Sequence, residues 1–332
     1  MKTCTIIMYH YVRELPFTRY PKIKGLLVSQ FKEQLDYLSR HYEFVTIGDC
    51  LKAIYEDADL PSNAVLLTFD DGYSDHFENV FPILKERKIQ GCFFPQAKAV
   101  QERNVLDVNK IHFVLASTDD PAKMKQEIFS LMDELRSKYN LASQEEYYAK
   151  YAIDDRFDTK DILFIKLLLQ KGLPEGARQE IANRLFKKYV SVDEKAFANE
   201  LYMSMEQLQC MYHEGMSIGS HGYSHIWMST VSAKEQEKDV DMSLQFLKQL
   251  GVNGHPWVMC YPFGSYNDSL ISILKKRNCG LALTIKVDIA NLTPANALTL
   301  ERLDTNDIPK NGKAEINHWT QKVLKDKESA IL

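Results

Sequence analysis

Two neighbouring carboxylates follow an apolar segment of the chain. Residues 64–69 form a largely apolar run, and Asp70, Asp71 and Gly72 come directly after it. Such a run is typical of a strand buried in a parallel sheet, and α/β folds place their active sites at the carboxyl ends of these strands. A tight turn at Gly72 could bring both carboxylates to one place, where one binds a metal ion and the other acts as a base. The alternative is an Asp-Gly turn that only closes the strand.

Two histidines, His221 and His225, lie four residues apart after a second predicted strand, 217–220. This offset brings the imidazoles together on a helical turn, and Gly222 also permits a loop. Two imidazoles and one carboxylate fill three positions of a zinc site and leave room for water and substrate. The chain has nine histidines, so the spacing alone is weak evidence. Together with the pair Asp70–Asp71 it favours a metal site.

A third segment, 260–267, ends a predicted strand in a turn that contains Pro262, Phe263 and Gly264. A turn of this kind can present a backbone N–H to the negative charge that develops on a carbonyl oxygen during hydrolysis. Turns with proline, glycine and packed aromatic residues are also common without any function. Alone, this segment indicates little.

Strands and helices alternate in the two outer parts of the chain. Apolar runs predict strands at 5–9, 44–47, 64–69, 91–94, 217–220, 257–261 and 280–284, with helical patterns between them. This alternation favours an α/β fold with a parallel sheet, and the chain is long enough for the sheet to close as a barrel.

The middle of the chain has a different pattern. Helical periodicity dominates there, and only two of the fourteen glycines fall in it. We therefore predict a barrel formed by residues 1–96 and 203–332, interrupted by an all-helical insertion at 97–202. The insertion could provide bulk and contacts between copies in an oligomer, or it could act as a lid over the substrate.

Composition limits the class of protein. The 332 residues carry 41 basic and 45 acidic side chains, a net charge of -4, and no long basic run, so nucleic-acid binding is not expected. No apolar stretch is long enough for a membrane span. The six cysteines show no C-x-x-C spacing and fit buried thiols of a reducing compartment. The first residues lack the long apolar region of a secretion signal, so we expect a cytoplasmic protein.

In chain order, the three segments resemble the motif set of the polysaccharide deacetylases, the NodB-homology proteins of carbohydrate esterase family 4. The motifs are T-F-D-D-G at 68–72, H-x-x-x-H at 221–225 and Y-P-F-G at 261–264. The resemblance covers both predicted barrel parts and excludes the helical insertion. It implies a distorted (β/α) barrel of the NodB-homology type, with fewer than eight strands, and a divalent metal ion, for which zinc is the expected choice.

The resemblance also implies a role for individual residues. Asp71, His221 and His225 would hold the metal ion. Asp70 would be the general base that activates a metal-bound water, and the backbone N–H of Phe263 would bind the oxyanion.

The general acid departs from the usual family pattern. Most members carry it on a late leucine-x-histidine motif, which has no counterpart here. The chain resembles instead the branch of poly-N-acetylglucosamine deacetylases, in which a tyrosine-histidine motif on the first strand supplies the acid. His10, in the run M-Y-H-Y-V at 8–12, matches that motif, so we predict His10 as the acid and keep His76 as an alternative.

A second departure concerns the arginine that commonly precedes the third motif, because Cys260 stands in its place. Arg302 could replace it beside Asp70, but we favour the interpretation of Arg302 as part of a surface ion pair. We give Cys260 no role.

These observations predict a metal-dependent deacetylase that removes the N-acetyl group of an acetamido sugar, in an oligosaccharide, a polysaccharide or a cytoplasmic precursor. We expect Tyr73, Tyr261 and Pro262 to contact this carbohydrate. Two alternatives stay open. The same barrel could cleave another C–N bond or an O-acetyl ester, or the chain could be a carbohydrate-binding protein without catalysis.

Overall fold

The structure, a computed structural model, describes residues 2–154, 158–253 and 256–329. The chain divides into two compact units. The barrel unit contains Met1–Glu14, Gly25–Glu102 and Leu201–Leu332, and the helical unit contains Leu15–Lys24 and Arg103–Glu200. The segment Leu15–Lys24 therefore groups with the helices, whereas the predicted boundaries assigned it to the barrel.

The barrel unit is built on strands that are nearly all parallel. Its main sheet runs in the order β5-β4-β3-β1-β8, β2 pairs with β3, β9 pairs with β1, and β6 pairs with β7. Among the strands of the described residues, only β8 is antiparallel to its neighbour. The strands are β1 (Thr3–Tyr9), β2 (Glu43–Phe44), β3 (Ala64–Asp71), β4 (Gly91–Pro95), β5 (Ser217–Ile218), β6 (Trp257–Cys260), β7 (Cys279–Leu283), β8 (Ala290–Asn291) and β9 (Leu303–Asp304).

Backbone hydrogen bonds beyond the regular strands connect the two sheets into a ring. Ser220 donates to Val258, and Cys260 donates to Ser220, which joins the end of β5 to β6. Thr284 donates to Leu300, which joins the end of β7 to the segment that leads into β9. The path β1-β3-β4-β5-β6-β7-β9 then returns to β1, because β9 pairs with β1. The described part of the chain thus confirms a distorted barrel with fewer than eight strands.

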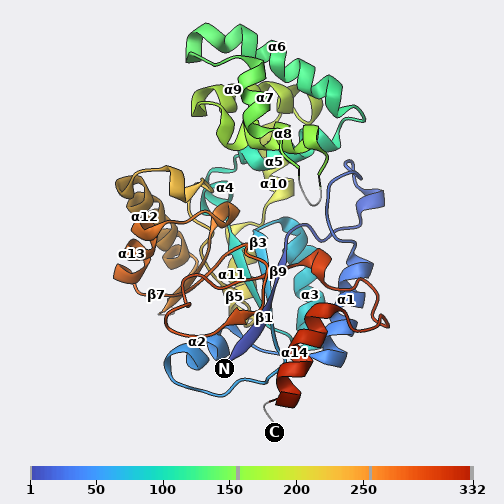
Figure 1. The fold of residues 1–332 in the computed structure, drawn as a ribbon, viewed down its shortest axis with the longest axis vertical. Coiled ribbons are helices and arrows are strands. Elements are labelled where there is room, and N and C mark those ends of the chain that lie inside the picture. Colours follow the sequence, from blue (N-terminus) through green and yellow to red (C-terminus); the bar gives the residue numbers. More distant parts are fainter. Residues whose placement is uncertain (1, 155–157, 254–255, 330–332) are drawn as a thin grey trace. The chain divides into compact units, whose positions relative to one another are not determined.

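Helices surround the strands of the barrel unit. In Figure 1, α12 and α13 lie on one side of the strands, and α1, α3 and α14 on the other. The apolar side chains Phe31, Leu35 and Leu38 recur at helical spacing along α1 and are fully buried. The helices of this unit are α1 (Val28–His41), α2 (Ile47–Tyr55), α3 (Phe81–Arg87), α4 (Ala97–Glu102), α11 (Met205–His213), α12 (Ala233–Gln249), α13 (Asp268–Lys276) and α14 (His318–Ser329).

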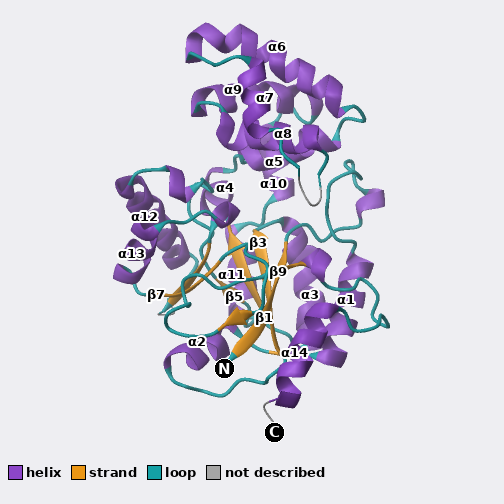
Figure 2. Ribbon diagram, in the orientation of Figure 1, coloured by secondary structure: helices purple, strands orange, loops and turns teal. Residues whose placement is uncertain are grey.

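The regular elements of the helical unit are helices (Figure 2). They are α5 (Asp107–Ala116), α6 (Pro121–Tyr139), α7 (Gln144–Tyr151), α8 (Lys160–Leu167) and α9 (Glu175–Tyr189), with α10 (Glu194–Leu201) at the boundary between the units. The unit has its own apolar core, in which Met132, Phe164 and Ile181 are fully buried. This composition agrees with the predicted all-helical insertion.

Within the described residues, no helix has the length and apolar character needed to cross a membrane. The six cysteines are free thiols, and all except Cys210 are buried. The prediction of buried thiols therefore holds for five of the six cysteines, and Cys210 is the exception.

Candidate active site

The two carboxylates at the end of β3 reach the site by different routes. Ala64 and Leu66 pack into one core cluster, whereas Val65, Leu67 and Phe69 pack into another. Successive side chains of a strand alternate between its two faces. Asp70 therefore lies on the same face of β3 as Ala64 and Leu66. Asp71 has a left-handed backbone with φ of +75°, and Gly72 follows with φ of +70°. Two consecutive left-handed residues break the alternation, so the turn that we expected at Gly72 already begins at Asp71.

The two histidines sit on a loop after β5 and not on a helical turn. Asp239 of α12 accepts hydrogen bonds from the backbone N–H groups of Tyr223 (2.7 Å) and Ser224 (2.9 Å), which lie between the two histidines. A side chain at Gly222, where φ is +70°, would meet this carboxylate, since a Cβ there would lie 2.9 Å from Asp239 Oδ1. His225 is itself left-handed, with φ of +50°. The buried Asp239 carboxylate therefore holds the backbone of the histidine loop through these two hydrogen bonds.

Asp71, His221 and His225 converge in the barrel unit. Asp71 Oδ1 lies 3.4 Å from His221 Nε2 and 3.5 Å from His225 Nε2. His221 Nδ1 lies 2.9 Å from the backbone oxygen of Cys260 and donates a hydrogen bond to it, which directs Nε2 at Asp71. Burial opposes protonation of this ring, but Cys260 and the Asp71 carboxylate raise the pKa of His221 well above its usual value, so a cation at this position would take the place of the Nε2 hydrogen. Burial lowers the pKa of His225 to about 3, which keeps its imidazole neutral. One carboxylate oxygen and two imidazole nitrogens are therefore available to a single cation.

The hydrogen-bond partners of Asp71 fit a cation. The carboxylate is buried, and its two oxygens accept hydrogen bonds from neutral donors, the Tyr73 hydroxyl on Oδ2 and the Gln96 amide on Oδ1, each at 2.6 Å. Burial opposes ionisation, but the hydrogen bond from His221 holds the pKa of Asp71 well below its usual value. A buried carboxylate held by neutral groups keeps its negative charge, and this donor set suits zinc or a similar divalent ion.

Asp70 is compensated by a protein cation instead. Arg302 donates to both of its oxygens, at 3.0 Å from Nη1 and 2.8 Å from Nη2. Both side chains are buried. Burial would raise the pKa of Asp70, but the guanidinium charge outweighs it and lowers this pKa to about 2. The interpretation of Arg302 as a surface ion-pair residue is therefore wrong. Arg302 directly precedes the closing strand β9, and its guanidinium lies beside Asp70, where we had considered it as the replacement for the arginine that Cys260 displaces in the sequence.

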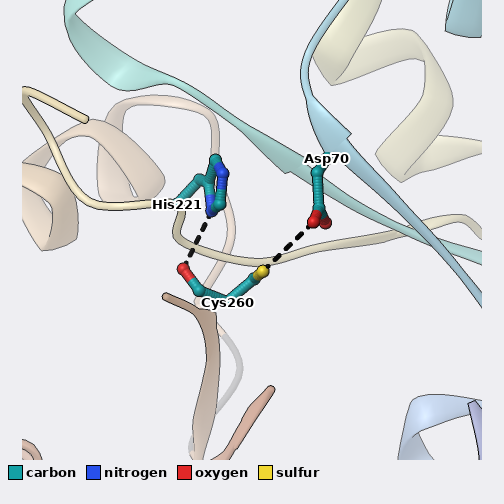
Figure 3. A group of neighbouring side chains, drawn as sticks. All are labelled: Asp70, His221 and Cys260. Atoms are coloured by element: carbon teal, nitrogen blue, oxygen red, sulfur yellow. Dashed lines mark hydrogen bonds between the residues drawn. The ribbon is translucent and has the colours of Figure 1, made fainter. Parts of the chain in front are cut away.

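Cys260 lies between the two halves of the site. Figure 3 shows its backbone oxygen next to His221 and its thiol next to Asp70, with Sγ 3.3 Å from Asp70 Oδ2. Asp70, His221 and Cys260 also bring one ligand atom each to within 4.8 Å of one another, so they form a second group that could hold a metal ion. However, Arg302 Nη2 donates to Asp70 and also lies 3.0 Å from Cys260 Sγ. A guanidinium in this position repels a metal ion. The Asp71 group is therefore the better candidate.

His10 directly follows β1 and is half-buried. It lies close enough to Asp70 and Asp71 for a positive charge on its ring to lower the pKa of both. His76 Nε2 lies 2.8 Å from the backbone oxygen of His10. A carbonyl oxygen can only accept, so His76 donates this hydrogen bond. His76 is fully buried, and burial lowers its pKa to about 4. It therefore supports the backbone at His10, and its position does not suit the alternative of a general acid.

The turn after β6 places Phe263 against the histidine loop. Phe263 has φ of +56°, and its ring centroid lies 4.6 Å from those of His225 and Trp227, stacked on the latter. The hydrogen bonds of the turn are donated by the N–H groups of Gly264 and Ser265. The turn thus makes no use of the Phe263 N–H.

The structure does not support the expected substrate contacts. Tyr73 and Tyr261 are fully buried, and Pro262 is buried as well. The Tyr261 hydroxyl donates to the backbone oxygen of Leu298, and the Tyr73 hydroxyl donates to Asp71. Both hydroxyls are used inside the protein, so these side chains shape the site from behind and are not on its surface.

A parallel barrel with acidic and imidazole groups at the carboxyl ends of its strands has the architecture of a barrel enzyme. The family model described as polysaccharide deacetylase matches residues 57–135 and 181–281, which make up more than half of the chain. The chain belongs to the polysaccharide deacetylase family, a family of hydrolases.

A sequence relative and several solved structures agree with this family. YxkH of Bacillus subtilis (strain 168), named as a candidate polysaccharide deacetylase, is 26% identical over 102 residues, which are 30% of this chain and 34% of YxkH. The match thus spans about a third of the length of that relative. Deacetylase PplD of Streptococcus pyogenes, solved in complex with acetate, has a TM-score of 0.57 at 16% identity and covers 98% of this chain and 97% of its own.

Two further structures show the same fold. IcaB from Ammonifex degensii has a TM-score of 0.54 at 19% identity, covering 98% of this chain and 97% of that chain. A de-N-acetylase from Aggregatibacter actinomycetemcomitans has a TM-score of 0.54 at 14% identity, covering 98% and 99%. At these identities the likeness shows the fold alone.

Proposed function

We propose that this chain is a metal-dependent deacetylase that hydrolyses the N-acetyl group of an acetamido sugar in an oligosaccharide or polysaccharide. The observation that carries the proposal is the buried Asp71 carboxylate, which faces two imidazoles and has neutral hydrogen-bond donors. Family membership supports deacetylation, and the name of the de-N-acetylase among the fold neighbours favours an amide over an ester.

Asp71, His221 and His225 would hold the divalent ion, for which we propose zinc. When bound, such an ion supplies Lewis acidity for the substrate carbonyl and lowers the pKa of water to about 7. Since His221 is fixed by its hydrogen bond to the Cys260 carbonyl, its ring keeps Nε2 directed at the site.

Asp70 acts as the general base in this proposal. The Arg302 guanidinium keeps it ionised, and only the ionised carboxylate can accept the proton of the attacking water. A carboxylate oxygen has more than one lone pair, so Asp70 can accept this proton while it remains bonded to Arg302. The bidentate contact also fixes the direction of the carboxylate.

His10 acts as the general acid, and the Phe263 N–H binds the oxyanion. Cleavage of the C–N bond releases an amine that must take up a proton. His10 is a half-buried histidine that interacts electrostatically with both carboxylates and is not one of the three candidate metal ligands. The Phe263 N–H is not used within its turn and can donate to the carbonyl oxygen as negative charge develops there. The products are acetate and the free amino sugar.

The proposal is tested by metal analysis and by acetate release from an N-acetylglucosamine oligomer series, an O-acetylated sugar and an N-formyl analogue. We expect stoichiometric divalent metal, acetate release from the N-acetyl oligomers, and loss of this activity after chelation. Acetate release only from the O-acetylated sugar, or formate release as the preferred reaction, would replace the substrate class. Oligomer binding without any hydrolysis would favour the carbohydrate-binding alternative.

A further inference from the structure

Gln96 is a fully buried amide at a strand end beside the candidate metal centre. It directly follows β4, and the last residue of β4, Pro95, is paired with Asp71 in the register of β3 and β4. The two strand ends are packed tightly, because a Cβ at Gly72 would lie 2.8 Å from Pro95 Cα. Backbone packing therefore fixes where the Gln96 side chain starts relative to Asp71.

The amide of Gln96 holds one particular oxygen of Asp71. Its Nε2 donates to Oδ1 at 2.6 Å, and Oδ1 is also the oxygen that faces the Nε2 atoms of His221 and His225. The other oxygen, Oδ2, is held by the Tyr73 hydroxyl. Gln96 is thus the neutral donor on the oxygen that would face the ion.

The acceptor end of the same amide is unpaired. Gln96 Oε1 is buried and has no hydrogen-bond partner among the described residues. An unpaired buried acceptor destabilises the folded state, and an apolar side chain of similar size would avoid this cost. The hydrogen-bonding groups of this amide therefore add little to the stability of the folded state. The hydrogen bond that the amide makes is the one to Asp71.

We infer that Gln96 is a positioning residue that sets the affinity of the metal centre, an inference that rests on the proposed function. A neutral donor orients Oδ1 without cancelling the carboxylate charge that attracts the ion. A cationic residue in this position, such as the arginine on Asp70, would fix the carboxylate equally well but would repel the ion. Hydrogen-bond partners of metal ligands commonly change metal affinity in this way.

The experiment compares Zn²⁺ affinity in the wild type, Gln96→Met and Gln101→Met, by competition with a chromophoric chelator. Methionine has a similar length and lacks the donor. Gln101 is an exposed glutamine that bonds to Gln249, so its variant is the matched control. We expect Gln96→Met to lose about 10- to 100-fold in Zn²⁺ affinity and the control to lose none. Saturating Zn²⁺ should restore most of kcat, because Gln96 is fully buried and acts through its hydrogen bond to Asp71.

Two results contradict the inference and can be told apart. If the wild type binds Zn²⁺ and Gln96→Met binds it equally well, Gln96 has no part in metal affinity while the proposed function stands. If the wild type binds no divalent ion, the proposed function fails and the inference fails with it. Should Gln96→Met not fold, Gln96→Asn decides, since its shorter amide loses the contact with Asp71 and should show the same loss of affinity.

Discussion

Arg302 and Asp70 form a buried, bidentate ion pair although 232 positions separate them in the chain. The pair places a fixed positive charge on the proposed base. The adjacent carboxylate, Asp71, instead accepts hydrogen bonds from the neutral Tyr73 hydroxyl and Gln96 amide. Asp70 and Asp71 are neighbours in sequence, yet their surroundings prepare one for proton transfer and the other for a cation. This difference in partners gives the two carboxylates different chemistry.

Replacing Arg302 with Met should destabilise the fold and shift the activity profile. Removal of one partner of a buried pair leaves an uncompensated charge, which typically costs about 3–5 kcal/mol. The pKa of Asp70 should rise, so the acid limb of the kcat/KM profile should move to higher pH. Urea unfolding and a pH–rate profile measure the two effects.

Arg277 provides a matched control for this substitution. It also forms a bidentate pair, with Asp241, but at a partly exposed position. Because solvent screens such a pair, Arg277→Met should cost less than about 1 kcal/mol and leave the profile in place. An acid limb that stays unchanged in Arg302→Met would show that Arg302 does not control Asp70.

Asparagine at position 70 and at position 71 should cause two different losses. Asp70→Asn should reduce kcat by about 10²- to 10⁴-fold and leave Zn²⁺ affinity close to that of the wild type, because the base is lost and the ligands are not. Asp71→Asn should lose both metal and activity. Metal titration together with acetate release measures this split, and equal Zn²⁺ affinity in Asp71→Asn and the wild type would remove Asp71 from the centre.

His10→Gln should affect substrates according to their leaving group. Amide cleavage needs a proton on the departing amine, so this variant should lose about 10²- to 10⁴-fold in kcat on an N-acetyl sugar. An aryl acetate releases a stable phenolate and should lose much less. Parallel assays on the two substrates give the comparison, and an equal loss on both would argue against an acid role for His10.

Low pH should destabilise the metal-free protein through His76. Burial lowers the pKa of this histidine from its ordinary 6.5 to about 4, so the unfolded chain takes up a proton at a pH where the folded protein does not. The stability is fully present above pH 6.5 and is lost as the pH falls toward 4, by up to about 3 kcal/mol.

Urea unfolding at pH 7 and pH 4.5 measures this effect, with His76→Phe to remove the titrating group. The difference in unfolding free energy between the two pH values should be smaller in His76→Phe than in the wild type. His213→Phe, at an exposed position, is the control and should behave like the wild type. An unchanged pH dependence in His76→Phe would assign the acid sensitivity to other groups.

Local sequence patterns determined the fold class and the residues that converge on the Asp71 group. An apolar run followed by Asp70 and Asp71 specifies a buried strand and its end, and parallel strands carry their ends to one side of a barrel. The H-x-x-x-H spacing and the turn at Pro262 are likewise local features. They could be recognised without coordinates because each is encoded within a few residues.

Only the tertiary structure decided which distant groups control those residues. Arg302 meets Asp70 because β9 closes the ring beside β1, and no local pattern reports that closure. Gln96 escaped prediction although it directly follows a predicted strand, since a lone glutamine there has no distinctive spacing. The backbone is already left-handed at Asp71, and Tyr73, two residues later, is fully buried with its hydroxyl bonded to Asp71. Burial of a side chain depends on the whole surrounding packing, which no local pattern reports.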